Sequence, residues 1–314
     1  MGHYAYRIEA AYDGATVAGY LKSRYGYSTR TLVKLKQQPD GLLQNGAHTR
    51  TVDILRAGDL LEVLRLEETD RPILPSRRKV EILYEDGDLL VYNKPPDMPV
   101  HTSCGHAQDT LENVHAAHCL QNGQAAGRLR ALNRLDRDTS GCVLAAKNQW
   151  VASRLAGQFE KAYRALVVGE VRYDGRIEGR IWRPDPIDLR RTVDERGQAA
   201  YTEYGVLRHG NGHAYLQFRL LTGRTHQIRV HMAHIGYPVL GDPLYGEPSP
   251  LIGRQALHCW SLDFLHPASG ERLRVTAPLP EDMQQAYNRT IGASPARKEN
   301  PESPPADLEL EREK

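Results

Sequence analysis

Two carboxylates and two guanidiniums fall within five consecutive positions of the chain, from Arg134 to Asp138. The turn-forming residues 139–141 follow, and the apolar run 142–146 after them predicts a buried strand. Charged groups next to a buried strand cost free energy unless they pair or react. A carboxylate held in such a place can act as a nucleophile or move a proton. We therefore expect an active site here.

A second candidate segment, residues 222–232, places histidine and arginine at the start of a helix expected over 225–235. Apolar residues at helical spacing would face the core: Ile228, Met232 and Ile235. His226 and Arg229 lie three positions apart on another face, beside free N–H groups that suit a phosphate or a carboxylate. Because a guanidinium stabilises an ionised carboxylate, Arg229 is a candidate partner for Asp136. An amphipathic surface helix is the alternative for this segment taken alone.

The third candidate is Tyr163, which stands between Lys161 and Arg164 at the start of an apolar strand expected over 163–171. A tyrosine ring can stack on a base, and its hydroxyl can hydrogen-bond or move a proton. A half-buried core aromatic residue is the alternative at this position.

Basic residues are concentrated in two parts of a chain whose net charge is only +2. Residues 1–80 carry 13 Lys and Arg against 9 Asp and Glu, and residues 128–164 carry 8 against 3. The tail from 293 holds 4 basic and 6 acidic residues, which lowers the total. Clustered positive charge is typical of a protein that binds a polyanion, because neutralised phosphates release counterions. A solvated basic surface is the alternative.

Length and composition indicate a soluble protein with room for two domains. The chain has 314 residues, of which 40% are hydrophobic and 25% charged. No apolar run approaches the ~20 residues of a membrane helix, and the N-terminus lacks the apolar core of a signal peptide. The four cysteines indicate no disulfide framework. We therefore expect a cytoplasmic protein that does not associate with membranes.

The order of the expected elements favours an α+β fold with a mostly antiparallel sheet over a doubly wound one. In a small α/β domain, 1–72, we expect strands at 4–11 and 41–46 and helices at 17–25 and 28–36, the second capped by Ser28. A linker, 73–80, leads to a larger domain, 81–288, with expected strands at 80–84, 89–93, 142–146, 163–171, 199–208, 213–221 and within 256–277, and helices at 110–119, 151–159 and 225–235. The tail, 293–314, has a composition that predicts disorder.

Several groups of residues occur in the order found in the RluA-type RNA pseudouridine synthases, and the chain resembles that family over roughly 80–285. The matching segments are 93–96 with 99–101, 134–141, 161–167, 222–231, 236–246 and 254–258. The resemblance implies the pseudouridine synthase catalytic fold, a mixed and mostly antiparallel sheet flanked by helices. It also implies that the protein isomerises uridines in RNA.

The resemblance further implies a role for individual residues. Asp136 matches the catalytic aspartate, Tyr163 the tyrosine that stacks on the target uracil and takes part in proton removal, and Arg229 the arginine paired with the aspartate. Arg134 matches an arginine that fills the space left by a flipped nucleotide. Further RNA contacts are expected from neighbouring side chains: Arg137, Lys161, Arg224 and His226. Asn133 stands where many members have histidine, a departure that bears on RNA contacts.

The implied reaction breaks the bond between uracil and ribose, turns the base within the site and rejoins it through carbon 5. It needs no redox step and no external nucleophile, so the resemblance implies neither a cofactor nor a metal. The carboxylate can attack the anomeric carbon or abstract a sugar proton to give a glycal, and both routes stay open. The target base must first leave its stack at a cost of about a few kcal/mol. Stacking on Tyr163 would offset roughly 1–3 kcal/mol of that cost.

The first domain resembles the αL RNA-binding motif, which many pseudouridine synthases share with a small-subunit ribosomal protein. The resemblance lies in residues 31–36, 41–46 and 57–63. It implies phosphate contacts from basic side chains of the helix: Arg30, Lys34 and Lys36. Ribosomal RNA is then the expected substrate, transfer RNA is the alternative, and a monomer is the expected state.

Two other kinds of protein are alternatives to an RNA pseudouridine synthase. A zinc protein would use the histidines and cysteines between 101 and 119, whose spacing is irregular: His101, Cys104, His106, His115, His118 and Cys119. A non-catalytic RNA-binding module that kept the fold would be expected to lack Asp136, Tyr163 or Arg229. All three residues are present.

Overall fold

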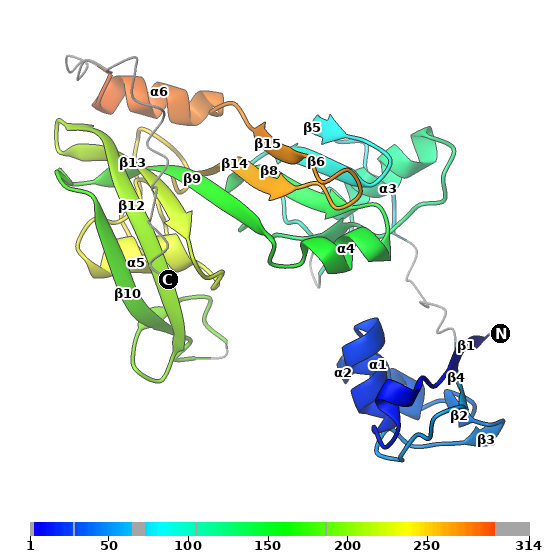
Figure 1. The fold of residues 1–314 in the computed structure, drawn as a ribbon. Helices are drawn as coiled ribbons and strands as arrows, with labels where there is room; N and C mark the ends of the chain where they lie inside the picture. Colours follow the sequence, from blue (N-terminus) through cyan, green and yellow to red (C-terminus); the bar gives the residue numbers. More distant parts are fainter. Residues whose placement is uncertain (1–2, 28, 65–72, 104–105, 186, 293–314) are drawn as a thin grey trace. The chain divides into compact units, whose positions relative to one another are not determined.

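A computed structural model describes residues 3–27, 29–64, 73–103, 106–185 and 187–292 (Figure 1). The chain divides into two units, Met1–Arg71 and Pro72–Lys314, each with its own hydrophobic core. The expected N-cap Ser28 and the tail 293–314 lie outside the described residues. Among the residues that are described, no helix is long and apolar enough to cross a membrane.

The first unit packs helices on a four-stranded antiparallel sheet with the strand order β1-β4-β2-β3. Its elements are β1 (His3–Arg7), a 3₁₀ turn (Ala10–Tyr12), α1 (Val17–Tyr25), α2 (Thr29–Lys36), β2 (Leu42–Gln44), β3 (Ala47–His48) and β4 (Leu60–Leu64). Thr16 caps α1 by accepting a hydrogen bond from the Gly19 N–H. Asn45 and Gly46 join β2 to β3 with φ of 51° and 79°, which an Asn-Gly hairpin turn requires.

The second unit is built on a sheet of 11 strands. The strand order along its main path is β11-β10-β12-β13-β9-β14-β8-β6-β5, with β15 paired to β14 and β7 to β8. Its strands are β5 (Glu81–Glu85), β6 (Leu89–Lys94), β7 (Arg130–Ala131), β8 (Ser140–Ala146), β9 (Phe159–Val168), β10 (Gly175–Trp182), β11 (Thr192–Val193), β12 (Gln198–Gly210), β13 (His213–Leu220), β14 (Leu257–Leu265) and β15 (Arg272–Thr276). In the described part, β8 and β14 are parallel and the other pairs are antiparallel. The expected α+β class with a mostly antiparallel sheet is confirmed.

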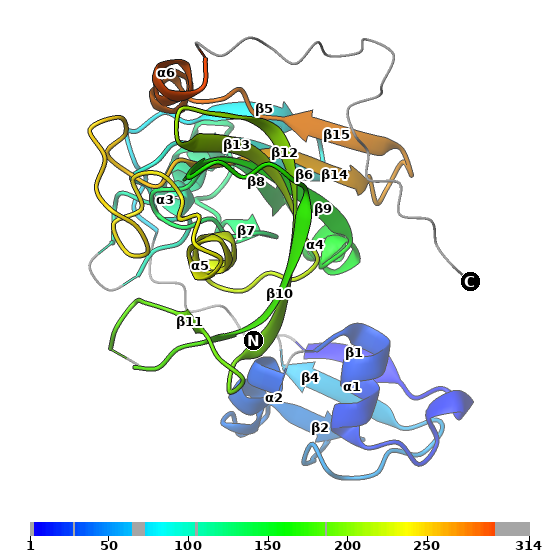
Figure 2. The same cartoon turned by 90° about the vertical axis from the view of Figure 1, so that its left-hand side faces the viewer.

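Helices cover parts of both faces of this sheet (Figure 2). They are α3 (Leu111–Gln121), α4 (Gln149–Leu155), α5 (Gln227–His234) and α6 (Glu281–Thr290). At the start of α5, Gln227 donates to Thr202 on β12. In α6, Tyr287 packs edge-on against Tyr215 of β13. The side chain of Tyr215 lies on the face of the sheet opposite to the face that carries Thr202. The start of α5 and the face of the sheet that carries Thr202 therefore form one side of the unit, and the site lies there.

The structure differs from the expected elements in several places. The helix expected over 151–159 ends at Leu155, because Gly157 takes a left-handed φ of 73°, and β9 begins two residues later. β10 was not expected, although Ile177 and Ile181 are buried on one face, since its glycines weaken the strand pattern. α6 was not expected either.

Gly141, where β8 pairs with β14 in parallel, is expected to tolerate no side chain. Its φ is 110°, and a Cβ on it would lie 2.1 Å from the carbonyl oxygen of Cys259. A backbone atom of a central strand cannot move aside cheaply. Gly141→Ala should therefore lower the free energy of unfolding of the second unit by about 3 kcal/mol or more.

Denaturant titration followed by tryptophan fluorescence measures this loss. The signal reports on the second unit alone, because all tryptophans lie in it: Trp150, Trp182 and Trp260. Gly253→Ala is the control, since a Cβ on Gly253 meets open space. Equal unfolding midpoints for the two variants would contradict the prediction.

Candidate active site

The loop 133–139 joins β7 to β8, and Asn133 fixes its start. The Asn133 side chain is buried, its Nδ2 donates to the carbonyl of Cys142 at 3.0 Å, and its Oδ1 accepts from the Leu144 N–H at 2.8 Å. The amide side chain thus extends the hydrogen bonding of β8. Both polar atoms of this side chain are therefore engaged within the protein.

Two buried cations hold the backbone of the same loop. Lys94 is fully buried, and its Nζ donates to three carbonyl oxygens at 2.8–2.9 Å, including that of Arg137. Burial lowers the pKa of Lys94 to about 7, and three acceptors match the three donors of its charged form. Arg254 donates to the carbonyl of Asp138 at 3.0 Å and binds the carboxylate of Asp282 on α6. The loop is therefore held rigidly at its centre.

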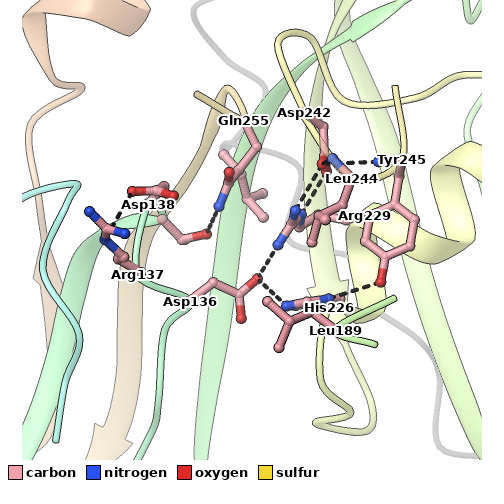
Figure 3. Close-up of polar contacts among 12 residues, drawn as sticks. Asp136, Arg137, Asp138, Leu189, His226, Arg229, Asp242, Leu244, Tyr245 and Gln255 are labelled. Carbon is pink, nitrogen blue, oxygen red and sulfur yellow. Dashed lines mark hydrogen bonds and ion pairs between the residues drawn. The ribbon is translucent and has the colours of Figure 1, made fainter. Parts of the chain in front are cut away.

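The loop presents Asp136 to a buried ion pair (Figure 3). Oδ2 of Asp136 accepts a hydrogen bond from Nη1 of Arg229 at 3.0 Å. Asp242 binds the same guanidinium through Nε at 2.6 Å and Nη2 at 2.8 Å. The side chains of Arg229 and Asp242 are 4% and 0% exposed, whereas that of Asp136 is 27% exposed. Asp136 is thus the member of this chain of charges that a substrate can reach.

Arg229 serves two carboxylates at once. Burial alone would lower the pKa of Arg229, but the hydrogen bonds and charge of Asp242 and the charge of Asp136 raise it, so the guanidinium stays protonated. Asp242 is itself fixed by the N–H groups of Leu244 and Tyr245 at 2.9 and 3.2 Å. The carboxylate of Asp242 neutralises the guanidinium of Arg229, so Asp136, Arg229 and Asp242 together carry a net negative charge. Asp242 is not among the residues expected from the sequence, although it lies in the matching segment 236–246.

His226 stands directly before α5 and not inside it. Its φ of 59° lies in the left-handed region, so the helix expected from 225 begins at Gln227. The imidazole lies between Tyr245, whose Oη is 2.8 Å from Nδ1, and Asp136, whose Oδ2 is 3.9 Å from Nε2 (Figure 3). Burial lowers the pKa of His226, which keeps the ring neutral at neutral pH.

Tyr163 and Asp136 line the same open cleft. Its other walls come from the loop 133–139, from the segment 224–229, and from single residues of β13 and β14. Burial raises the pKa of Tyr163 well above its usual value, and the neighbouring Cys259 thiol and Asp136 carboxylate act in the same direction. The hydroxyl of Tyr163 is therefore neutral, and the side chain reaches the cleft with 6% of its surface exposed.

The side chains expected to contact RNA differ in their exposure and in whether other groups of the protein already bind them. Arg134 is exposed at the cleft, and within the described residues it has no hydrogen bond or ion pair. Arg224 is exposed and donates through Nε to a backbone carbonyl at 3.1 Å. Arg137 is bound to the carboxylate of Asp97 by two hydrogen bonds, so its charge is already matched. Lys161 lies over the ring of Phe159, and burial lowers its pKa.

The basic residues expected in the first unit lie on α2. Lys34 and Lys36 are exposed there. Arg30 belongs to the same helix, but its side chain lies outside the described residues.

Three of the histidines considered as zinc ligands bind side chains that are not among the candidate ligands. His115 binds the hydroxyl of Tyr92, His118 binds Glu85, and His106 binds Asp109. Cys104 lies outside the described residues. In the part of the chain that is described, no group of three His, Cys, Asp or Glu side chains is placed to hold a metal ion.

Comparison with known proteins finds similar proteins among the RNA pseudouridine synthases. The family profile described as RNA pseudouridylate synthase matches residues 88–234. The uncharacterized RNA pseudouridine synthase YjbO of Bacillus subtilis is 39% identical over 268 residues, which are 83% of this chain and 94% of that protein. Ribosomal large subunit pseudouridine synthase D of Xanthomonas campestris is 36% identical over 278 residues, 82% of this chain and 83% of that protein.

Solved structures are similar to this chain as well. Human RNA pseudouridylate synthase domain containing 1 has a TM-score of 0.53 and 29% identity, over 64% of this chain and 83% of that one. Human RNA pseudouridylate synthase domain containing 4 matches with the same TM-score at 24% identity, over 66% and 92%, and supports the fold.

Proposed function

The chain belongs to the RNA pseudouridylate synthase family, and on that premise we propose that it isomerises a uridine of ribosomal RNA with Asp136 as the reacting group. The observation that carries this proposal is the position of Asp136. It is a partly exposed carboxylate on a rigid loop, paired with the buried Arg229. Oδ2 of Asp136 is occupied by that pair, and within the described residues Oδ1 has no hydrogen-bond partner. Oδ1 is therefore the oxygen that reacts.

The neighbouring residues fit the steps that the reaction requires. A flipped base has to be held beside Asp136, and the ring of Tyr163 in the same cleft offers a surface for stacking. Its hydroxyl can relay the proton from carbon 5: the oxygen accepts that proton while its own passes to the carboxylate of Asp136, which is free again once the new bond at carbon 5 has formed. Arg134 is exposed at the cleft and can occupy the place that the base leaves. Attack on the anomeric carbon and formation of a glycal both use the same carboxylate.

Ribosomal RNA is the proposed substrate because several relatives are named ribosomal large subunit pseudouridine synthase D. We assign the first unit, and on it Arg30, Lys34 and Lys36, to gripping that RNA, because two of these cations are exposed on one helix. We also propose that the protein acts as a monomer. A ribosomal RNA substrate also supports a cytoplasmic location.

Pseudouridine mapping of total RNA from cells with and without this gene tests the substrate. We expect one or a few positions in ribosomal RNA to lose pseudouridine when the gene is deleted. Loss confined to transfer RNA would overturn the ribosomal assignment and leave the activity in place. An unchanged map in both classes of RNA would overturn the proposed function.

Tyr163→Phe separates the two roles of the tyrosine, because it keeps the ring and removes the hydroxyl. We expect the rate of pseudouridine formation to fall by about 10²-fold or more, as for other proton-transfer groups, with RNA affinity unchanged. Single-turnover kinetics and a binding titration measure the two effects. Tyr215→Phe, on the opposite face of the sheet, is the matched control. An unchanged rate in Tyr163→Phe would limit Tyr163 to stacking.

A further inference from the structure

The imidazole of His226 is held in one tautomer by its neighbours. Oη of Tyr245 lies 2.8 Å from Nδ1 of His226 and 2.8 Å from the backbone nitrogen of Arg191. The Arg191 amide can only donate to the tyrosine oxygen, and among the described residues Nδ1 is the one acceptor within hydrogen-bond distance of the hydroxyl, so the hydroxyl proton points at Nδ1. Nδ1 then accepts a hydrogen bond. The neutral ring therefore carries its proton on Nε2, on the side of Asp136 (Figure 3).

That Nε2–H has no acceptor among the described residues. The nearest carboxylate oxygen, Oδ2 of Asp136, is 3.9 Å away, which is beyond a hydrogen bond, and it already accepts from Arg229. The His226 side chain lines the cleft and is 13% exposed. Its backbone has a left-handed φ of 59°, a conformation that costs a histidine free energy and is typical of functional sites. A fixed donor thus faces the cleft beside the reacting carboxylate.

We propose that His226 donates Nε2–H to the 2′-hydroxyl of the target uridine, so that the site selects ribose over deoxyribose. This inference rests on the proposed function, since it takes Asp136 as the group that reacts with the sugar. Attack on the anomeric carbon brings Asp136 to C1′, and the glycal route brings it to the proton on C2′. The 2′-oxygen is bonded to C2′ and lies next to C1′, so either route places it close to Nε2.

The charge of the donor fits a hydroxyl better than a phosphate. A neutral imidazole N–H suits a neutral acceptor, whereas phosphate oxygens are best matched by cations such as Arg134 and Arg224 at the same cleft. The 2′-hydroxyl is also the group by which proteins tell RNA from DNA at a given position. Tyr245 is then a positioning residue, because it acts on the sugar only through the tautomer of His226.

The test compares two RNAs that differ only in the target nucleotide, uridine or 2′-deoxyuridine. The RNA is the one that the mapping identifies, so a transfer RNA target would overturn the ribosomal assignment without affecting this test. The readout is the ratio of single-turnover rates on the two RNAs, or of their dissociation constants if the deoxy RNA gives no product. A ratio does not depend on the fraction of folded protein, and any intrinsic effect of the missing hydroxyl is common to all variants.

The wild type should react faster with the uridine RNA than with the 2′-deoxyuridine RNA. We expect the ratio of the two rates to fall by about tenfold in His226→Phe, which corresponds to the loss of one hydrogen bond. In Tyr245→Phe this ratio should lie between those of the wild type and His226→Phe. His234→Phe, at the exposed end of α5, is the matched control and should keep the wild-type ratio. A wild-type ratio in His226→Phe would overturn the proposal, because the histidine would then contact another group, such as a phosphate.

A spectroscopic measurement tests the tautomer without any RNA. In protein labelled with ¹⁵N-histidine, the signals that disappear in His226→Phe belong to His226. We expect them to show a proton on Nε2 and none on Nδ1 in the wild type, and a mixture of the two tautomers in Tyr245→Phe. A proton on Nδ1 in the wild type would overturn the proposed role of Tyr245 and of the Nε2 donor.

Discussion

Replacing Asp136 by asparagine is expected to abolish pseudouridine formation while RNA binding is retained. Asparagine keeps the shape of the side chain and the bond to Arg229, but its amide is neither a nucleophile nor a base. The loss of a reacting group of this kind lowers the rate by about 10⁴-fold or more. RNA affinity should stay within about fivefold, since the variant keeps the size of the side chain and removes one partly exposed charge, worth about 1 kcal/mol. Single-turnover kinetics and a filter-binding titration measure both effects.

The matched control is Asp138→Asn, two positions further along the same loop. The Asp138 side chain is 38% exposed and lies 4.0 Å from Arg137, and what holds the loop at this point is its backbone carbonyl. This variant should keep nearly full activity. Similar losses in both variants would mean that the loop as a whole, and not the carboxylate of Asp136, is needed.

Asp242→Asn is expected to have the largest effect on stability. Asp242 is fully buried and makes two hydrogen bonds to Arg229, so removing its charge leaves the buried guanidinium with Asp136 as its remaining partner. The new amide also points a donor at a donor. Breaking a buried pair in this way costs about 3–5 kcal/mol. Denaturant titration followed by tryptophan fluorescence should show that loss for the second unit. Activity should fall as well, because Arg229 also orients Asp136.

Asp263→Asn is the control for this prediction. Asp263 pairs with Arg272 between two neighbouring strands, and the arginine side chain is 72% exposed. An exposed pair is worth about 1 kcal/mol or less, so this variant should unfold close to the wild type. If the two variants unfolded at the same denaturant concentration, the ion pair of Asp242 would not support the fold in the way described.

Local sequence patterns were enough to predict much of the sheet. The apolar run after the charged loop became β8, and the Asn-Gly turn at 45–46 joins β2 to β3. Asp136 and Arg229 were expected to pair, and they lie 3.0 Å apart although 93 positions separate them in the chain. That expectation came from the chemistry of the two groups and from the family resemblance.

The rest of the site depends on contacts that no local pattern encodes. Asp242 reads in the sequence as a turn residue, and only the fold brings it to Arg229. His226 has helical spacing, yet its left-handed φ turns the ring toward Asp136. Arg137 looks like an RNA contact because it is basic, but Asp97, 40 positions away, binds it. In each case the deciding partner is distant in the chain.

We assign the isomerisation to Asp136, and mapping RNA from cells in which that one codon is changed shows whether this carboxylate carries it out. Pseudouridine is mapped in the wild type, in the deletion strain and in a strain that makes Asp136→Asn at the normal level. We predict that the Asp136→Asn strain lacks pseudouridine at the same positions as the deletion strain. Pseudouridine at those positions in the Asp136→Asn strain would mean that a group other than Asp136 reacts with the uridine.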